Sequence, residues 1–112
     1  MAGPGVINGR AYRSVVAGIP LAEPGDVPAL WWYREHGAGG VEHRYMLVMP
    51  DGQQPMSGSL WEPTADVAPR RASTVRGRLV EIDREAREYY GADVPRVVVE
   101  IVGDIVSVSD DR

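Results

Sequence analysis

The feature that most constrains the fold is a near-mirror segment from Trp31 to Tyr45, which reads WWYREHGAGGVEHRY. Aromatic and charged residues lead into a Gly-rich stretch and leave it in reverse order. This pattern is typical of two antiparallel strands joined by a turn, in which aromatic and charged side chains pair across the strands. The glycines supply the positive φ angles that a tight turn needs. We therefore expect strands at Ala29–Glu35 and Val41–Met49.

The length of the turn determines which side chains meet. A five-residue loop from Gly37 to Val41 places Glu35 opposite His43 and Tyr33 opposite Tyr45. Side chains alternate between the two faces of a strand, so these four residues would share one face. The other face would carry Trp32, Arg34, His36 and Arg44. A shift of one residue in the register would exchange every partner.

A helix is predicted between Thr74 and Tyr90, where the hydrophobic period changes. Steps of four and three place five residues on one stripe: Val75, Leu79, Ile82, Ala86 and Tyr89. Ser73 is a candidate N-cap and Gly91 a candidate C-terminal glycine. The alternative is a strand over Val75–Ile82 that leads into a short helix from Arg84.

The remaining segments read mostly as strands and loops. Val6–Val16 is strand-like with a turn at Asn8-Gly9, and a short strand is expected at Leu60-Trp61, after a polar, flexible-looking stretch from Gln53 to Ser59. Arg96–Val108 forms either a hairpin or one strand bent at Gly103-Asp104, and its run of valines suggests a central strand covered on both faces. Together these segments predict one α+β domain over residues 1–112. It has a mainly antiparallel sheet of about five or six strands, or a small half-open barrel, and one helix near 74–90.

The composition excludes several kinds of chemistry. The chain has no cysteine, and all 12 of its basic residues are arginine, so thiolate and lysine-based catalysis are absent. A net charge of −4 argues against nonspecific nucleic-acid binding, although Arg70, Arg71, Arg76 and Arg78 cluster. No apolar run is long enough to cross a bilayer, and MAGPGVINGR lacks the features of a secretory signal. We expect a soluble cytoplasmic protein without a bound cofactor.

The hairpin carries the candidate site residues, and two hypotheses follow from its faces. The favoured one is a non-catalytic binding module that contacts a protein partner, or a second copy through the sheet edges. Its binding residues would be Trp32, Arg34, Arg44 and Trp61, since tryptophan and arginine are typical of binding hot spots. The alternative is a cofactor-free isomerase or cyclase with a small apolar ligand. Its acid–base residues would be Glu35, His43, Tyr33 and Tyr45. No metal site is expected, because the two histidines point to opposite faces in this register.

Overall fold

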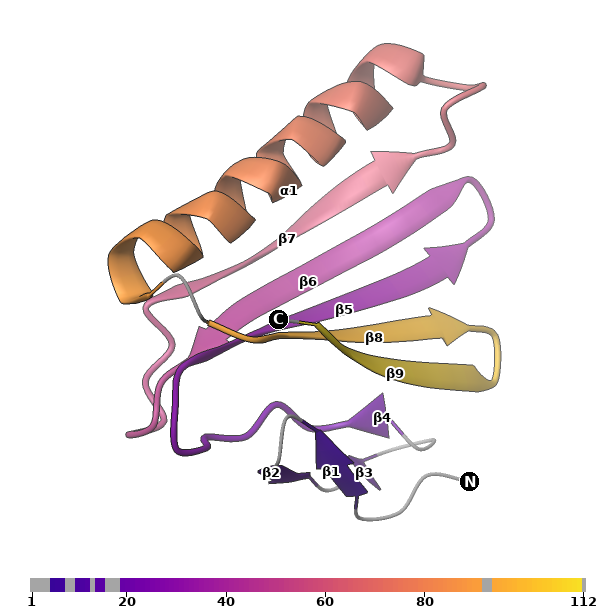
Figure 1. The fold of residues 1–112 in the computed structure, drawn as a ribbon. Coiled ribbons are helices and arrows are strands. Elements are labelled where there is room, and N and C mark those ends of the chain that lie inside the picture. The colour runs from indigo at the N-terminus through magenta and orange to yellow at the C-terminus, as the bar shows by residue number, and fades with distance from the viewer. Residues whose placement is uncertain (1–4, 8–9, 13, 16–18, 92–93, 112) are drawn as a thin grey trace.

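A computed structural model describes residues 5–7, 10–12, 14–15, 19–91 and 94–111 of the chain. They form a five-stranded sheet with one long helix on one face, and two small strand pairs near the N-terminus (Figure 1). In chain order the elements are β1 (Gly5–Ile7), β2 (Arg10–Tyr12), β3 (Ser14–Val15), β4 (Ile19–Pro20), β5 (Ala29–Gly37), β6 (Gly40–Val48), β7 (Met56–Pro63), α1 (Pro69–Tyr90), β8 (Arg96–Val102) and β9 (Ile105–Asp111). The α+β class predicted from the sequence is confirmed.

The large sheet has the strand order β7-β6-β5-β8-β9. Neighbouring strands are antiparallel except β5 and β8, which run parallel. The parallel pair arises because β8 joins the sheet after the chain has returned along α1, and such a crossover lets a strand run in the direction of its neighbour. Within the described residues the sheet stays open, with β7 and β9 at its edges, and it does not close into a barrel.

The turn between β5 and β6 is tighter than the sequence suggested. Gly37 pairs with Gly40, which leaves Ala38 and Gly39 as a two-residue turn, and Gly39 has a φ of 95°. Two-residue turns with positive φ match the twist of the strands that they join, so this turn replaces the expected five-residue loop.

The shorter turn shifts the register by one residue. Arg34, not Glu35, lies opposite His43, and Tyr33 lies opposite Arg44. The predicted pairing of Glu35 with His43 is therefore wrong, and so is the pairing of Tyr33 with Tyr45. Every assignment of a β6 side chain to a face changes with it.

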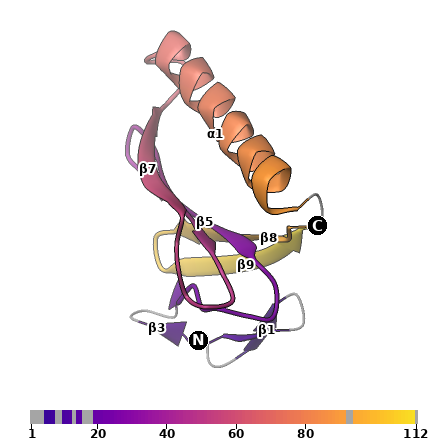
Figure 2. The same cartoon turned by 90° about the vertical axis from the view of Figure 1, so that its left-hand side faces the viewer.

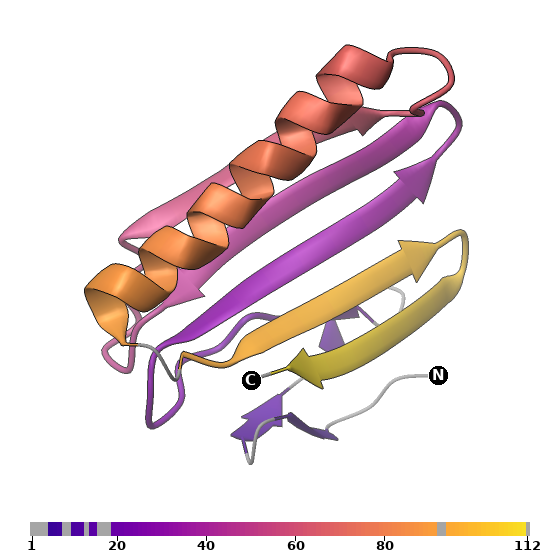
Figure 3. The ribbon, with the colours of Figure 1, turned by 45° about the horizontal axis from the view of Figure 1, so that its top comes forward.

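The observed register gives the sheet two distinct faces. Trp31, Tyr33 and Arg44 lie on one, which we call the N-terminal face, because Ile19 and Ala22 pack against it. Trp32 and His43 lie on the other, the helix face, which α1 covers in part. Figures 2 and 3 show α1 and the small N-terminal strands on opposite sides of the sheet. The prediction that the histidines point to opposite faces is wrong, since His36 and His43 both lie on the helix face.

The N-terminal face holds the larger apolar core. Trp31, Val97 and Val99 are buried there, together with Ala29, Tyr33, Val48 and Ile101. The hydroxyl group of Tyr33 donates a hydrogen bond of 2.6 Å to the carbonyl oxygen of Pro20. This bond ties the segment before β5 to the sheet.

The helix α1 begins earlier than predicted. It starts at Pro69. Proline has no backbone N–H, but the first N–H groups of a helix have no partner within the helix, so proline is well tolerated there. Ser73 therefore lies inside the helix rather than at its cap. Gly91 follows its end with a positive φ of 125°, as glycine allows. The alternative of a strand over Val75–Ile82 is wrong.

The buried stripe of α1 matches the prediction except at its last member. Val75, Leu79, Ile82 and Ala86 are buried against the sheet, whereas Tyr89 is 74% exposed. Beneath the helix the phenol of Tyr45 lies over Gly58, where an added Cβ would come within 2.8 Å of the Tyr45 hydroxyl oxygen. The glycine at position 58 therefore makes room for an aromatic side chain of the neighbouring strand.

Two further expectations changed for the outer strands. β7 spans Met56–Pro63 and is longer than the predicted Leu60-Trp61, because pairing with β6 orders a polar stretch that looked flexible. Arg96–Val108 folds as a hairpin, with Gly103 in the turn at a φ of 61°. β8 lies beside the edge strand β9, and only alternate residues along β8 are buried. The prediction that its valine run is covered on both faces is therefore wrong.

The Asn8-Gly9 turn lies outside the described residues. None of the described segments forms a helix long and apolar enough to cross a membrane.

Candidate binding groove beside the helix

A groove lies on the helix face between α1 and β8. It exists because α1 packs over β7 and β6, which leaves β8 and β9 beyond its cover (Figure 3). The groove has a volume of about 320 Å³ and is open to solvent. It is lined by Trp32, Arg34, His43, Glu62, Arg76, Leu79, Val80, Asp83 and Arg96. We call it the α1–β8 groove.

Trp32 forms the aromatic part of the groove floor. Its ring is half-buried, and the guanidinium carbons of Arg34 and Arg96 lie 5.4 and 5.9 Å from its centroid. Both distances are within the range of a cation–π interaction. Because the arginines come from β5 and β8, the parallel pairing of these strands assembles this cluster.

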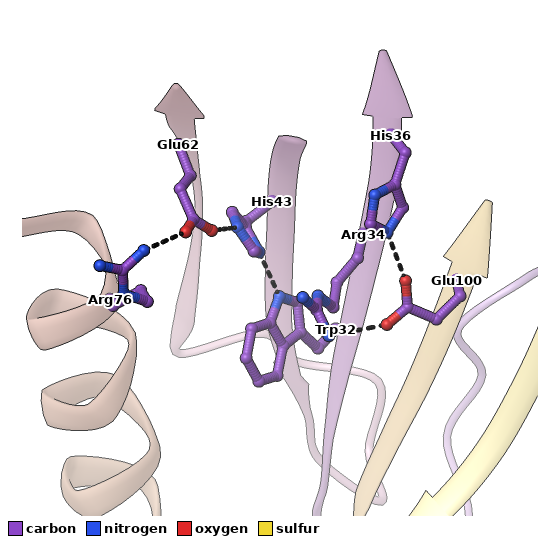
Figure 4. Close-up of polar contacts among 7 residues, drawn as sticks. All are labelled: Trp32, Arg34, His36, His43, Glu62, Arg76 and Glu100. Carbon is purple, nitrogen blue, oxygen red and sulfur yellow. Dashed lines mark hydrogen bonds and ion pairs between the residues drawn. The ribbon is translucent and has the colours of Figure 1, made fainter. Parts of the chain in front are cut away.

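A chain of hydrogen bonds holds Trp32 in place (Figure 4). The indole Nε1–H of Trp32 donates to Nδ1 of His43 at 2.9 Å, and Nε2 of His43 lies 2.8 Å from Oε1 of Glu62. The second oxygen of that carboxylate accepts a bond of 3.0 Å from Arg76. An indole can only donate, so Nδ1 accepts, and the neutral ring that this implies carries its proton on Nε2 and donates it to Glu62.

The chain of hydrogen bonds is shielded from water at its centre. The His43 side chain is 1% exposed and that of Glu62 is 15% exposed. Burial alone would raise the pKa of the Glu62 carboxyl, but hydrogen bonds from His43 and Arg76 outweigh it and hold that pKa below its ordinary value. The carboxylate is therefore charged at neutral pH, and it links the buried imidazole to the helix.

The arginines around Trp32 are each held by a carboxylate. Arg34 donates to Glu100 at 2.7 Å, and His36 lies 2.6 Å from the second oxygen of the same carboxylate (Figure 4). Across the groove, Arg96 of β8 lies 3.4 Å from Asp83 of α1. Charges of both signs therefore alternate along the groove wall.

The four residues of the enzyme hypothesis do not come together. Glu35 and Tyr33 lie on the N-terminal face, whereas His43 and Tyr45 lie on the helix face. Glu35 is exposed and lies 3.5 Å from Arg44. Burial raises the pKa of the Tyr33 phenol to about 12, so this group holds its proton throughout the neutral range. A cavity of about 370 Å³ on the N-terminal face reaches Tyr33 but none of the other three.

The predicted binding residues are divided between the faces as well. Trp32 and Arg34 lie in the α1–β8 groove, while Arg44 and Trp61 lie on the N-terminal face. Trp61 is 45% exposed and packs over Gly40, where an added Cβ would lie 2.8 Å from the ring. The expectation that Trp32, Arg34 and Arg44 share one face is wrong, because it depended on the longer turn.

Sequence reasoning missed the partners that complete the groove. The sequence pattern assigns no role to Glu62 or Asp83, and it places Arg96 only at the start of a strand. One signal was available in β8, where Arg96, Val98 and Glu100 alternate with buried valines and so share a face. Within the described residues no group of three metal-ligating side chains converges. The chain matches no known family model, and no curated protein or solved structure is significantly similar to it.

Proposed function

We propose that this chain is a small non-catalytic binding module that takes an extended polypeptide segment of a partner protein into the α1–β8 groove. One observation supports this function above the others. Trp32 is an accessible indole that is fixed by a hydrogen bond to His43 and flanked by the guanidinium groups of Arg34 and Arg96.

The composition of this cluster favours recognition. Tryptophan and arginine are the residues most enriched among those that carry the binding energy of protein interfaces. Trp32 is also rigid before any partner arrives, because its ring nitrogen is bonded to a buried imidazole. A side chain that is already ordered loses little conformational entropy on binding, so more of the contact energy appears as affinity.

The shape and charge of the groove favour a polypeptide as the partner. The volume of about 320 Å³ is at the small end of the range for ligand pockets, and the site is open to solvent, so a drug-sized ligand would stay partly exposed in it. The walls pair apolar Leu79 and Val80 with charges of both signs, which suits a chain of mixed side chains. The net charge of −4 disfavours a nucleic acid.

The groove is poorly suited to acid–base catalysis. Both nitrogens of His43 are engaged within the protein, and its side chain is 1% exposed. Both oxygens of Glu62 are engaged as well. A general acid or base has to reach the atom whose proton it moves, and the buried His43 has no ring nitrogen free for a ligand.

The proposal is tested by selecting ligands from a displayed library of random extended peptides and measuring their affinities by calorimetry. We expect selected peptides whose binding is weakened about 30-fold by Trp32→Ala, the scale of a hot-spot residue. Trp61→Ala is the matched control, because Trp61 is accessible but lies on the other face. Arg34→Ala, which changes a side chain that is 33% exposed, should weaken binding without disturbing the core. Peptides that bind equally well to the Trp32→Ala and Arg34→Ala variants would overturn the proposal.

A further inference from the structure

We propose that the cavity on the N-terminal face binds a small amphipathic carboxylate, a molecule whose aliphatic chain ends in a carboxylate group. This site is independent of the α1–β8 groove, because it lies on the side of the sheet away from α1 (Figure 2). The cavity has a volume of about 370 Å³ and is open to solvent. The inference rests on its apolar walls, on the way one wall is fixed, and on a single arginine.

One wall of the cavity is the segment that precedes β5. Residues 19–22 line it with isoleucine, proline, leucine and alanine, so this wall is apolar throughout. The hydroxyl group of Tyr33 donates a hydrogen bond of 2.6 Å to the carbonyl oxygen of Pro20 and also bonds to the backbone of Ala22. The wall is therefore fixed to the sheet before a ligand arrives. A preformed wall loses little conformational entropy on binding.

The floor of the cavity comes from the sheet itself. Tyr33 of β5 and Met46 of β6 lie on it, and Gln54, in the connection between β6 and β7, borders it. This connection lies beside the segment before β5, since a Cβ added to Gly52 would come within 3.7 Å of the Pro24 side chain. The lining is thus mostly apolar with a few polar groups, which is the usual composition of a small-molecule site.

Arg44 supplies the charge of the cavity. Among the described residues that line it, this side chain is the one that carries a formal charge at neutral pH. Its guanidinium carbon lies 5.9 Å from the centroid of the Tyr33 ring, which holds it beside the apolar wall. Its nearest carboxylate, Glu35, is 3.5 Å away, beyond the roughly 2.7–2.9 Å of a charge-assisted hydrogen bond. The two side chains are 43% and 49% exposed, so this pair contributes little and leaves the guanidinium group available.

This distribution of charge determines the class of ligand. One cation beside apolar walls matches a molecule with one anionic group and an aliphatic body. A guanidinium group can bind a carboxylate through two parallel hydrogen bonds. The α1–β8 groove differs, because its arginines are held by carboxylates of the same chain. The volume is at the small end of the range for ligand pockets, so a chain of about eight carbons is the appropriate probe.

An NMR titration of ¹⁵N-labelled protein with octanoate, up to about 20 mM, tests the proposal. We expect the amides of Leu21 and Met46 to shift with a dissociation constant of about 1 mM, while the Trp32 indole does not move. Hexanoate should bind about tenfold more weakly, because two methylene groups fewer leave water. Octylamine, which has the same chain and the opposite charge, should cause no shifts at these positions.

Two variants with matched controls separate the carboxylate contact from the apolar wall. Arg44→Gln should weaken octanoate binding about fivefold. Arg78→Gln should leave it unchanged, because Arg78 is similarly exposed and paired with a glutamate but lies on α1. Leu21→Ser should weaken binding about fivefold as well, since it removes apolar surface from the wall. Val27→Ser is its control, because Val27 is 49% exposed against 50% for Leu21 and does not line the cavity.

A retained amide spectrum shows that each variant is folded. A wild-type chain whose cavity amides do not shift at the highest octanoate concentration would overturn the proposal. So would octylamine that binds as tightly as octanoate, or an Arg44→Gln variant that binds octanoate as tightly as Arg78→Gln does. Shifts confined to Trp32 and Val80 would also overturn it, because they would assign the carboxylate to the α1–β8 groove.

Discussion

His43→Phe tests the hydrogen-bond chain that holds Trp32. Phenylalanine fills the volume of the imidazole but removes both ring nitrogens, so the bonds of 2.9 Å to Trp32 and 2.8 Å to Glu62 are lost. A neutral hydrogen bond contributes about 1 kcal/mol to stability, and one to a charged group about 1.5–3 kcal/mol. The site is 1% exposed, so the more apolar ring recovers about 1 kcal/mol through burial. We expect a net loss of about 2 kcal/mol in the free energy of unfolding.

The assay is urea unfolding followed by far-UV circular dichroism, with His36→Phe as the matched control. The His36 side chain is 36% exposed and bonds only to Glu100 at the surface, so its replacement should cost under about 1 kcal/mol. A His43→Phe variant as stable as the wild type, or no less stable than His36→Phe, would refute the reasoning. That result would mean that the hydrogen bonds of His43 contribute nothing to the free energy of unfolding beyond the packing of the ring.

Two other predictions concern Glu62 and the glycines. Because the pKa of Glu62 is lowered in the folded state, its charge stabilises the protein fully above the ordinary value of 4.5, and this contribution is lost as the pH falls through the folded value. The stability difference between wild type and Glu62→Gln, measured by urea unfolding, should therefore be constant near neutral pH and shrink in acid; a difference that grows in acid would contradict this. Gly40→Ala should cost at least about 2 kcal/mol in thermal unfolding, because its Cβ would meet the backbone of Glu62 and the Trp61 ring. Gly77→Ala should gain about 0.5–1 kcal/mol, since nothing lies within 4 Å of that position; equal effects of the two changes would count against the packing described.

Local patterns were enough to predict the main elements. The mirrored residues around Gly37 and Gly40 indicated a hairpin, and the apolar period from Val75 to Ala86 indicated a helix. Both patterns depend on near neighbours in the chain, so they are visible without a structure. The helix start was less accurate, because Pro69 in a first turn and proline in a loop give the same sequence signal.

The candidate site depended on the register between β5 and β6, which the length of the turn sets and the sequence does not determine. Three glycines near the tip allow either a two-residue or a five-residue connection, and the choice moves every side chain of β6 to the other face. The two-residue turn places His43 beneath α1 and leaves Glu35 on the far side. The sequence pattern is therefore compatible with both pairings of His43, and the turn decides between them.

The groove itself depends on contacts between distant segments. The antiparallel strands β5, β6 and β7 bring Trp32 and Glu62 together, and Arg96 joins them because β8 inserts parallel to β5. Neither periodicity nor composition encodes such an insertion. The alternation of charged and apolar residues in β8 was the one local sign that this strand presents a polar face.

The most direct test of the proposed function is an NMR titration of ¹⁵N-labelled protein with a peptide selected as described above. The chain has three tryptophans and hence three indole N–H groups that report separately. We predict that the Trp32 indole shifts on binding together with the amide of Val80 on α1, while the Trp61 indole on the N-terminal face does not move. A peptide that shifts Trp61 and leaves Trp32 unchanged would contradict the assignment of recognition to the α1–β8 groove.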